Sequence, residues 1–340
     1  MSEPDHAAGA AARGPGQPEK QPDRQQAARR RGRPAQRGPV RRALIRSRTW
    51  MPGLLLVSPS ILLIGVFVYG MIGWNTRVAL SDQHAPVQDG SFVGLTNFVS
   101  LWQEARWPAA VANAVVFTVV FVGGALFLGW LLGLLLDKGI RGEAVFRTLF
   151  LAPMAVSFIA TGVVWRWLMN PAPAERATGL NALFVHFNVD FLVNDWWTAP
   201  DLGMAAMALP AVWQLSGYIM ALFLAGFRGV PEDLREAARV DGCSEWGVYW
   251  RVVMPQLRPV MLSAIIILGH MSLKVFDLII AIAGQQIVAD VPAVYMWAMV
   301  FEVRDPAKGA TIASYLLIAV AVFVIPYLVW TVRKERSEGR

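Results

Sequence analysis

The sequence contains a single cysteine, Cys243, in 340 residues. One thiol cannot form an internal disulfide, a four-cysteine zinc site or an iron–sulfur cluster within the chain. The four histidines are scattered and include no His-x-x-x-His pair, the spacing that places two metal ligands on one face of a helix. These counts argue against metal chemistry on this chain. We also expect no bound cofactor and no catalytic residue here.

Charged residues are also scarce, at 16% of the chain against about 25% in an ordinary globular protein. Basic charge is concentrated in residues 1–48, which hold 12 Lys and Arg against 4 Asp and Glu, and the rest of the chain is nearly neutral. No Phe, Tyr or Trp precedes Trp50, so this basic segment lacks the aromatic side chains that stack on bases. The sequence thus argues against a nucleic-acid partner.

Residues 1–48 are rich in Ala, Gly, Pro, Gln and Arg and contain few side chains that could form a core. We expect a disordered cytoplasmic tail that fixes the membrane topology and touches anionic lipid. A lipid-surface anchor or a regulatory arm is the alternative. No short apolar core with a small-residue cleavage site precedes position 49, so we do not expect a cleaved signal peptide.

Long stretches without charge dominate the remaining residues. Five stretches of 18 to 30 residues contain no Asp, Glu, Lys or Arg: 49–76, 107–136, 148–165, 202–227 and 309–332. A sixth uncharged run, 259–273, continues in an apolar segment beyond Lys274 and Asp277, and we expect a span of about 258–283 there. About 20 apolar residues are enough for a helix to cross the hydrocarbon core of a bilayer. The sequence predicts an all-α membrane bundle of six transmembrane helices within residues 49–340.

A soluble helical protein is the alternative, but its helices would carry polar side chains on their outer faces. In Phe117–Leu136 the only polar side chain is Thr118. The orientation follows from basic residues, which concentrate in cytoplasmic loops. With a cytoplasmic amino terminus, the inside segments hold 24 Lys and Arg and the outside loops hold 5. We expect a multi-pass protein of the cell membrane with both termini in the cytoplasm.

The longest predicted cytoplasmic loop, residues 228–258, has 5 basic and 5 acidic residues, so it is not a polybasic lipid patch. Pro231, followed by two acidic residues, is typical of a helix start. Asp241-Gly242 predicts a turn, because glycine readily adopts positive φ. Ser244 is placed to cap a second helix, which we expect to end before Pro255. The pattern predicts two short helices forming a projecting knob that fits a groove on another protein.

This loop resembles a known motif. Glu236-Ala237-Ala238, followed by Gly242 and by Met254-Pro255, has the spacing of the EAA loop of permease subunits in ATP-binding-cassette (ABC) importers. The resemblance is closest to the sugar-permease branch, which includes the maltose and glycerol-3-phosphate permeases. Segments 92–98, 113–117 and 164–181 resemble the same branch, in the order of the first permease of a heterodimeric pair.

The resemblance implies a function and a set of partners. A second permease would complete the translocation path, two cytoplasmic ATPase subunits would hold ATP and Mg, and an extracytoplasmic binding protein would deliver a small sugar. The EAA loop would dock into the ATPase through Glu236, Ala237, Ala238, Asp241, Gly242 and Pro255. The chain has no Gly-x-x-x-x-Gly-Lys-Ser/Thr motif, so we expect ATP hydrolysis in the partner and not here.

Polar residues at membrane depth are the candidates for the translocation path, because they are costly in lipid and usually face a protein interior. His270, Lys274 and Asp277 are spaced to share one face of the fifth predicted helix. They either line the path and bind sugar hydroxyls, or include a self-neutralising Lys274–Asp277 pair. Further path candidates are Asn113, Gln214 and Ser216, for which interhelical hydrogen bonding is the alternative role.

Several functions remain open from sequence. A neutral mono- or disaccharide is favoured as substrate, because glycerol 3-phosphate would call for more basic groups than Lys274; a glycerol-3-phosphate or polyol importer is the alternative. An ion-coupled secondary carrier usually has broken helices or several membrane carboxylates, and Asp277 is the single carboxylate within the predicted spans. Neither a carrier nor a membrane receptor or scaffold explains the spacing of the EAA loop.

Overall fold

The protein is described by a computed structural model that covers residues 55–87, 90–173, 176–200 and 202–338. The predicted tail, residues 1–48, lies outside these residues. The chain divides into two units, Met1–Val66 and Phe67–Arg340. The described residues of the first unit are helical and form the start of the helix Leu55–Ala79, which is long and apolar enough to cross a membrane.

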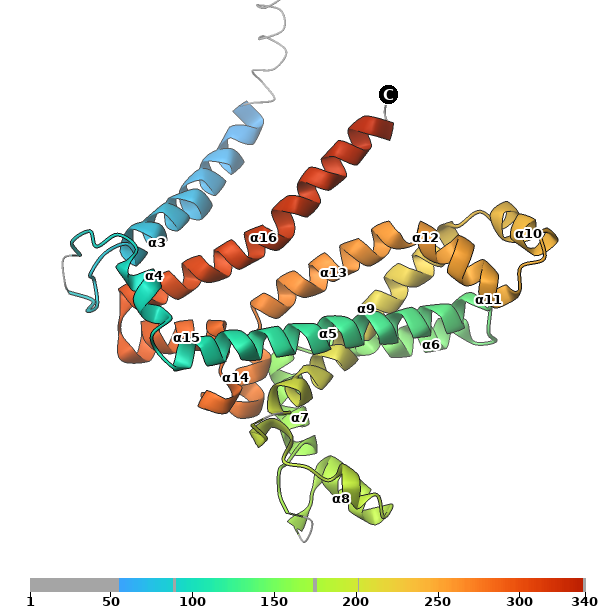
Figure 1. Cartoon of the computed structure of the whole chain (residues 1–340), viewed down its shortest axis with the longest axis horizontal. Helices are drawn as coiled ribbons and strands as arrows, with labels where there is room; N and C mark the ends of the chain where they lie inside the picture. Colours follow the sequence, from blue (N-terminus) through green and yellow to red (C-terminus); the bar gives the residue numbers. More distant parts are fainter. Residues whose placement is uncertain (1–54, 88–89, 174–175, 201, 339–340) are drawn as a thin grey trace, which may run out of the picture. The chain divides into compact units, whose positions relative to one another are not determined.

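The second unit is built from helices and turns, with an isolated bridge between Ser81 and Phe92 in its described part. Its helices (Figure 1) are α3 (Met71–Ala79), α4 (Thr96–Leu101), α5 (Arg106–Asp137), α6 (Glu143–Leu151), η2 (Ala152–Ala155), α7 (Phe158–Leu168), α8 (Gly179–His186), η4 (Asp190–Leu192), η5 (Trp196–Thr198), α9 (Gly203–Gly229), α10 (Glu232–Val240), α11 (Glu245–Val248), η6 (Tyr249–Val253), α12 (Met254–Gln256), α13 (Arg258–Leu273), α14 (Asp277–Ala283), η7 (Ile287–Ala289), α15 (Pro292–Trp297), η8 (Ala298–Val303) and α16 (Pro306–Glu338).

The pair α5 and α9 forms the core of this unit, and the two helices pack along much of their length. Gly129 and Gly133 of α5 are buried against α9. A Cβ atom on Gly129 would approach the side chain of Ile219 to 2.6 Å, so glycine is what allows this close approach. Small residues at helix interfaces bring backbones together and increase van der Waals contact within membranes.

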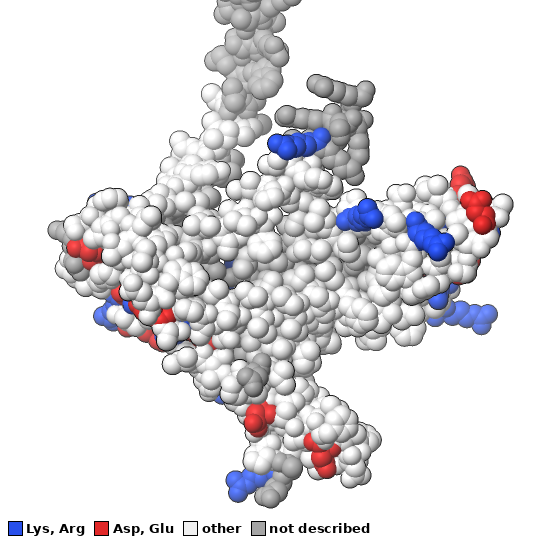
Figure 2. All heavy atoms as spheres, viewed as in Figure 1, with Lys and Arg blue, Asp and Glu red and all other residues white. Residues whose placement is uncertain are grey.

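The opposite face of α5 is apolar and exposed. The exposed fractions of Val119 and Phe127 are 66% and 63%. On the face shown in Figure 2, the surface over the middle of α5 is free of Lys, Arg, Asp and Glu, and charged atoms lie near α10 and α11 at one end of it. A helix that packs on a neighbour with one face and exposes an apolar band on the other is typical of a bundle surrounded by lipid. The all-α membrane fold predicted from sequence is confirmed.

Four described helices are long and apolar enough to span a membrane: Leu55–Ala79, α5, α9 and residues 306–331 of α16. Two bent pairs raise the number to six if each pair counts as one span. The sequence predicted one span over residues 148–165, but the first pair shows that this stretch is not one straight helix. Helices α6 and η2 lead into α7 through a bend of 97°. Val156 is extended there and the Ser157 hydroxyl accepts a hydrogen bond from the Ala160 N–H, so α7 begins as a new helix.

The prediction of one helix over 258–283 is also wrong. Helix α13 ends at Leu273, residues 274–276 leave the helical conformation, and α14 starts at Asp277. Helix α14 packs against α7, whereas α13 packs against α5 and α16. The two halves share α9 as a neighbour but differ in their main packing partners. Hydropathy alone does not record this break.

A network of polar side chains ties the start of α5 to α15 and α16. Lys308 forms an ion pair with Glu104 at 2.7 Å, and the Tyr295 hydroxyl donates a hydrogen bond to the same carboxylate. Arg106 forms an ion pair with the buried Asp290 and stacks over the Tyr295 ring at 4.3 Å. These contacts hold together the segments at this end of α5, α15 and α16.

Candidate functional site

The predicted coupling loop is a helix–turn–helix unit at one end of α5 and α9 (Figure 1). Helix α10 starts after Pro231, with Glu232 and Asp233 in its first turn, as the sequence predicted. Carboxylates there interact favourably with the positive end of the helix dipole. The start of α10 is therefore determined by residues next to it in the sequence.

Gly242 closes α10 with a left-handed backbone, at φ +82°. Its N–H donates to the carbonyl of Arg239, and the Cys243 N–H donates to the carbonyl of Ala238, each at 3.0 Å. These two bonds are those of a Schellman motif, which satisfies the last carbonyls of a helix and requires positive φ at this position. The predicted Asp241-Gly242 turn is confirmed.

The second helix of the unit begins at the predicted cap, because the Ser244 hydroxyl accepts a hydrogen bond from the Gly247 N–H at 3.2 Å. The expectation that Pro255 ends this helix is wrong. Helical backbone continues through α12 to Gln256, and the bend of 63° comes before α13. Proline lacks an N–H and crowds the preceding turn. The π-helical turn η6 widens the helix immediately before it, so the ring is accommodated.

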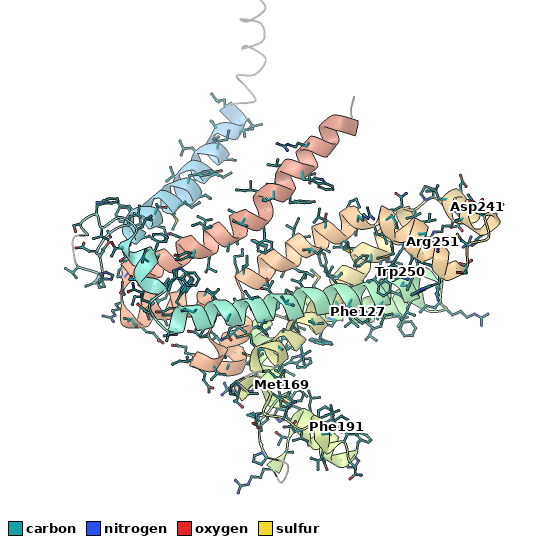
Figure 3. The ribbon with its side chains drawn as sticks, in the orientation of Figure 1. Phe127, Met169, Phe191, Asp241, Trp250 and Arg251 are labelled. Carbon is teal, nitrogen blue, oxygen red and sulfur yellow. The ribbon has the colours of Figure 1, made fainter. Side chains whose placement is uncertain are left out.

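The exposed surface of this unit combines apolar and acidic groups. Val240 and Trp246 have exposed fractions of 88% and 60%, and Glu236, Ala237 and Asp241 are exposed beside them. Ala238 is buried against its own chain. A hollow of about 630 Å³ lies under the turn and is lined by Asp241, Gly242, Cys243, Ser244, Trp246, Gly247, Trp250 and Arg251. Figure 3 shows Asp241 at the far end of the loop and Trp250 on the side toward Phe127 of α5.

Two arginines of α10 hold the unit together, and neither was predicted as a site residue from sequence. Arg239 forms ion pairs with Glu232 at 3.0 Å and with Glu245 at 2.8 Å, so it links the two helices across the turn. Hydrogen bonds to Glu245 and then Glu232 raise the pKa of Arg239 above its usual value. Arg235 lies deeper and bonds Asp137 at the end of α5. Asp137 was visible in the sequence only as the charge that ends a 30-residue uncharged stretch.

The interrupted helix places His270, Lys274 and Asp277 differently from the single stripe expected. His270 lies on α13, Lys274 at the break and Asp277 at the start of α14. Two hollows adjoin the break. One of about 550 Å³ is lined by His270, Lys274, Phe276, Trp297 and residues of α15 and α16, and one of about 80 Å³ is lined by Lys274, Asp277 and aromatic side chains of α5 and α7. No ion pair joins Lys274 to Asp277 among the described residues.

The other three path candidates form hydrogen bonds within the bundle. The Asn113 amide donates to the carbonyls of Val288 and Asp290, at 3.1 and 2.9 Å, and so anchors η7 to α5. The Gln214 amide donates to the carbonyl of Val156 at the bend before α7. The Ser216 hydroxyl donates to the Trp213 carbonyl, and Ser216 also lines a hollow of about 590 Å³ between α5, α6 and α9.

Comparison with known proteins identifies the family. The model of the family described as "binding-protein-dependent transport system inner membrane component" matches residues 125–334, which extend from the middle of α5 through the coupling loop into α16. The chain belongs to this family. The permease is also 36% identical over 284 residues to a probable ABC transporter permease protein of Pyrococcus horikoshii, covering 83% of this chain and 96% of that protein.

Two further similarities agree. A xylose/arabinose import permease protein of Haloferax volcanii is 34% identical over 270 residues, covering 78% of the permease and 83% of the relative. A bacterial ABC transporter that imports the acidic polysaccharide alginate has a chain with a TM-score of 0.69 at 18% identity, covering 85% of this chain and 98% of that chain. At that identity the structural match shows a shared fold. The resemblance to ABC importer permeases noted in the sequence is confirmed.

Proposed function

We propose that this permease is the membrane subunit of an ATP-driven, binding-protein-dependent importer of a neutral mono- or disaccharide. The observation that carries the proposal is the helix–turn–helix unit α10–α11, which combines the EAA spacing with an exposed apolar surface at one end of the core helices. Relatives are named as permeases for xylose/arabinose and for trehalose/maltose, which supports a sugar as substrate.

In this proposal the permease lies in the inner membrane with both termini in the cytoplasm, pairs with a second permease, and carries two ATPase subunits. Glu236 and Asp241 contact the ATPase, Ala237 permits close approach, and Gly242 keeps the turn in shape. Ala238 supports the unit from its buried side. ATP binding and hydrolysis, with Mg, take place in the ATPase. Movement of the docked unit then passes to the spans as a rigid-body rotation.

The break between α13 and α14 supports a site for sugar within the path. Discontinuous helices line substrate sites in secondary transporters, because an unwound segment presents polar groups within the membrane, so the break indicates a substrate site and does not by itself distinguish an importer from an ion-coupled carrier. His270, Lys274 and Asp277 occur around this break, next to the two hollows. Hydroxyl groups of a neutral sugar would accept hydrogen bonds from Lys274 and His270 and donate to Asp277 without adding net charge. Glycerol 3-phosphate or a polyol is the second candidate substrate.

The test is transport in vesicles that contain the permease with its second permease, its ATPase and the binding protein encoded beside it. A ligand screen on that binding protein, using neutral sugars, polyols and glycerol 3-phosphate, chooses the radiolabelled substrate. We expect uptake that requires ATP and the binding protein. Uptake driven by a proton or sodium gradient and indifferent to ATP would overturn the proposal in favour of a secondary carrier. Binding of glycerol 3-phosphate alone would overturn the neutral-sugar part only.

A further inference from the structure

Arg235 is the most highly connected side chain of the coupling loop. One of its terminal nitrogens, Nη1, bonds Asp137 Oδ2 at 3.2 Å, and the other, Nη2, donates to the carbonyl oxygen of Phe227 at 2.6 Å. The Tyr249 hydroxyl donates to the same Asp137 oxygen at 2.8 Å, and the guanidinium group lies 5.7 Å from the centre of the Tyr249 ring. One side chain of α10 thus joins the ends of α5 and α9 and the π-helical turn η6.

The chemistry of Asp137 explains why this junction depends on Arg235. Asp137 is the last residue of α5, where the negative end of the helix dipole disfavours a carboxylate. Its side chain is only 5% exposed, so water does little to offset that cost. Arg235, itself 12% exposed, supplies the compensating charge. The carbonyl of Phe227, near the end of α9, accepts a hydrogen bond from the Val230 N–H at 3.3 Å and a shorter, charge-assisted one, at 2.6 Å, from the second arm of the same guanidinium.

The other ion pairs of this region differ in burial and in reach. Arg239 pairs with Glu232 and Glu245, which belong to the same helix–turn–helix unit, and these side chains are 40% or more exposed. Arg228 pairs with Glu143 and links α9 to α6 without touching α10. Exposed pairs are largely screened by water and contribute little to rigidity. Arg235 alone among these three connects the coupling unit to both core helices through a buried contact.

We infer that Arg235 is a positioning residue that fixes the coupling unit to the ends of α5 and α9, so that movement of the docked unit is transmitted to the spans. This inference rests on the proposed function and names the joint through which coupling passes. The fork of two donors in a guanidinium can hold a carboxylate and a carbonyl together, which a lysine ammonium does less well. Without the joint, the coupling unit could move with the ATPase while the spans stay behind.

The test compares Arg235→Gln with Arg228→Gln in the complete transporter. We expect Arg235→Gln to assemble and hydrolyse ATP, but to transport about tenfold less substrate per ATP, within the range of ordinary coupling energies. Arg228→Gln should keep the wild-type ratio. Arg235→Lys, which keeps the charge but not the fork, should give an intermediate ratio. A purely structural role would lower assembly and ATP hydrolysis together and leave transport per ATP unchanged.

A distance measurement tests the joint without transport. Cys243 is the only cysteine and lies in the coupling turn, so one spin label can be attached there and a second at Leu135→Cys, on the exposed face of the last turn of α5. We expect a narrow label-to-label distance distribution that broadens with Arg235→Gln and stays narrow with Arg228→Gln.

Each failure has a distinct signature. Wild-type uptake that ignores ATP would refute the proposed function. Normal ATP-driven uptake in the wild type, with an unchanged transport ratio and distance distribution in Arg235→Gln, would refute only the joint. If Arg235→Gln does not assemble, Tyr249→Phe decides the matter, because it removes a single hydrogen bond to Asp137. A reduced transport ratio in Tyr249→Phe supports the joint, and a wild-type ratio overturns it.

Discussion

Replacing Gly242 measures how strongly coupling depends on the backbone of one turn. Gly242 has φ +82°, and a Cβ atom there would meet no heavy atom within 4 Å. A substitution therefore adds no steric clash with neighbouring residues, and its cost comes from the backbone conformation alone. The series Gly242→Asn, Gly242→Ala and Gly242→Pro raises that cost step by step.

The expected loss of uptake follows from the positive φ of Gly242 and from the hydrogen bond that its N–H donates. Alanine in a left-handed conformation costs about 1–2 kcal/mol, which changes the ratio of native to rearranged turn roughly 5- to 30-fold. Asparagine tolerates this conformation better and should cost less. Proline fixes φ near −65° and removes the N–H that bonds Arg239, at a cost of about 3 kcal/mol or more. Uptake should fall in the order Gly, Asn, Ala, Pro.

The assay is ATP-driven uptake and ATP hydrolysis in vesicles, with the amount of inserted permease measured by immunoblot. Gly242→Pro should insert normally and lose coupling. Gly139→Ala is the matched control, because Gly139 also has positive φ, at +69°, and open space around its Cβ position, but it lies in the turn between α5 and α6. Normal uptake by Gly242→Pro would refute the reasoning. So would a loss of uptake in Gly139→Ala as large as that in Gly242→Ala.

Three further predictions concern residues outside the coupling loop. Gly217→Ala would place a Cβ atom 1.9 Å from a backbone oxygen of a neighbouring helix, so it should lower the yield of folded protein and its thermal midpoint in detergent, whereas Gly123→Ala, with no neighbour within 4 Å, should not. Asp277→Ala should impair uptake more than assembly; equal loss of both would indicate a structural role. Burial raises the pKa of Glu104, but hydrogen bonds from Lys308 and Tyr295 outweigh this and lower it. The resulting stabilisation is complete above the usual value of 4.5 and is lost as the pH falls through the lowered pKa, so thermal midpoints measured against pH should show an acid-side loss that Glu104→Gln removes.

The coupling turn shows how much local sequence can predict. Pro231, Gly242 and Ser244 each act on backbone within a few residues, through proline geometry, positive φ and a hydroxyl cap. Their effects were therefore predictable without any knowledge of packing. The uncharged stretches predicted the spans α5 and α9 for the same reason, because crossing a bilayer requires length and apolarity of the segment itself.

The breaks in the other spans were not predictable in this way. The bend before α7 lies within the uncharged stretch 148–165, and the interruption between Leu273 and Asp277 lies within the predicted span of about 258–283. Which neighbour each half packs against decides where the helix stops. That choice depends on segments distant in the chain, and so it was missed.

The sequence by itself determined the class of protein, its uncharged stretches and the turn of its coupling loop, because each depends on composition or on neighbouring residues. Only the tertiary structure decided which polar groups work together. Arg235 and Asp137 are 98 residues apart, and nothing in either neighbourhood predicts their contact. It forms because α5 and α9 pack through glycines and bring their ends under the same coupling helix, where a buried carboxylate needs a cation.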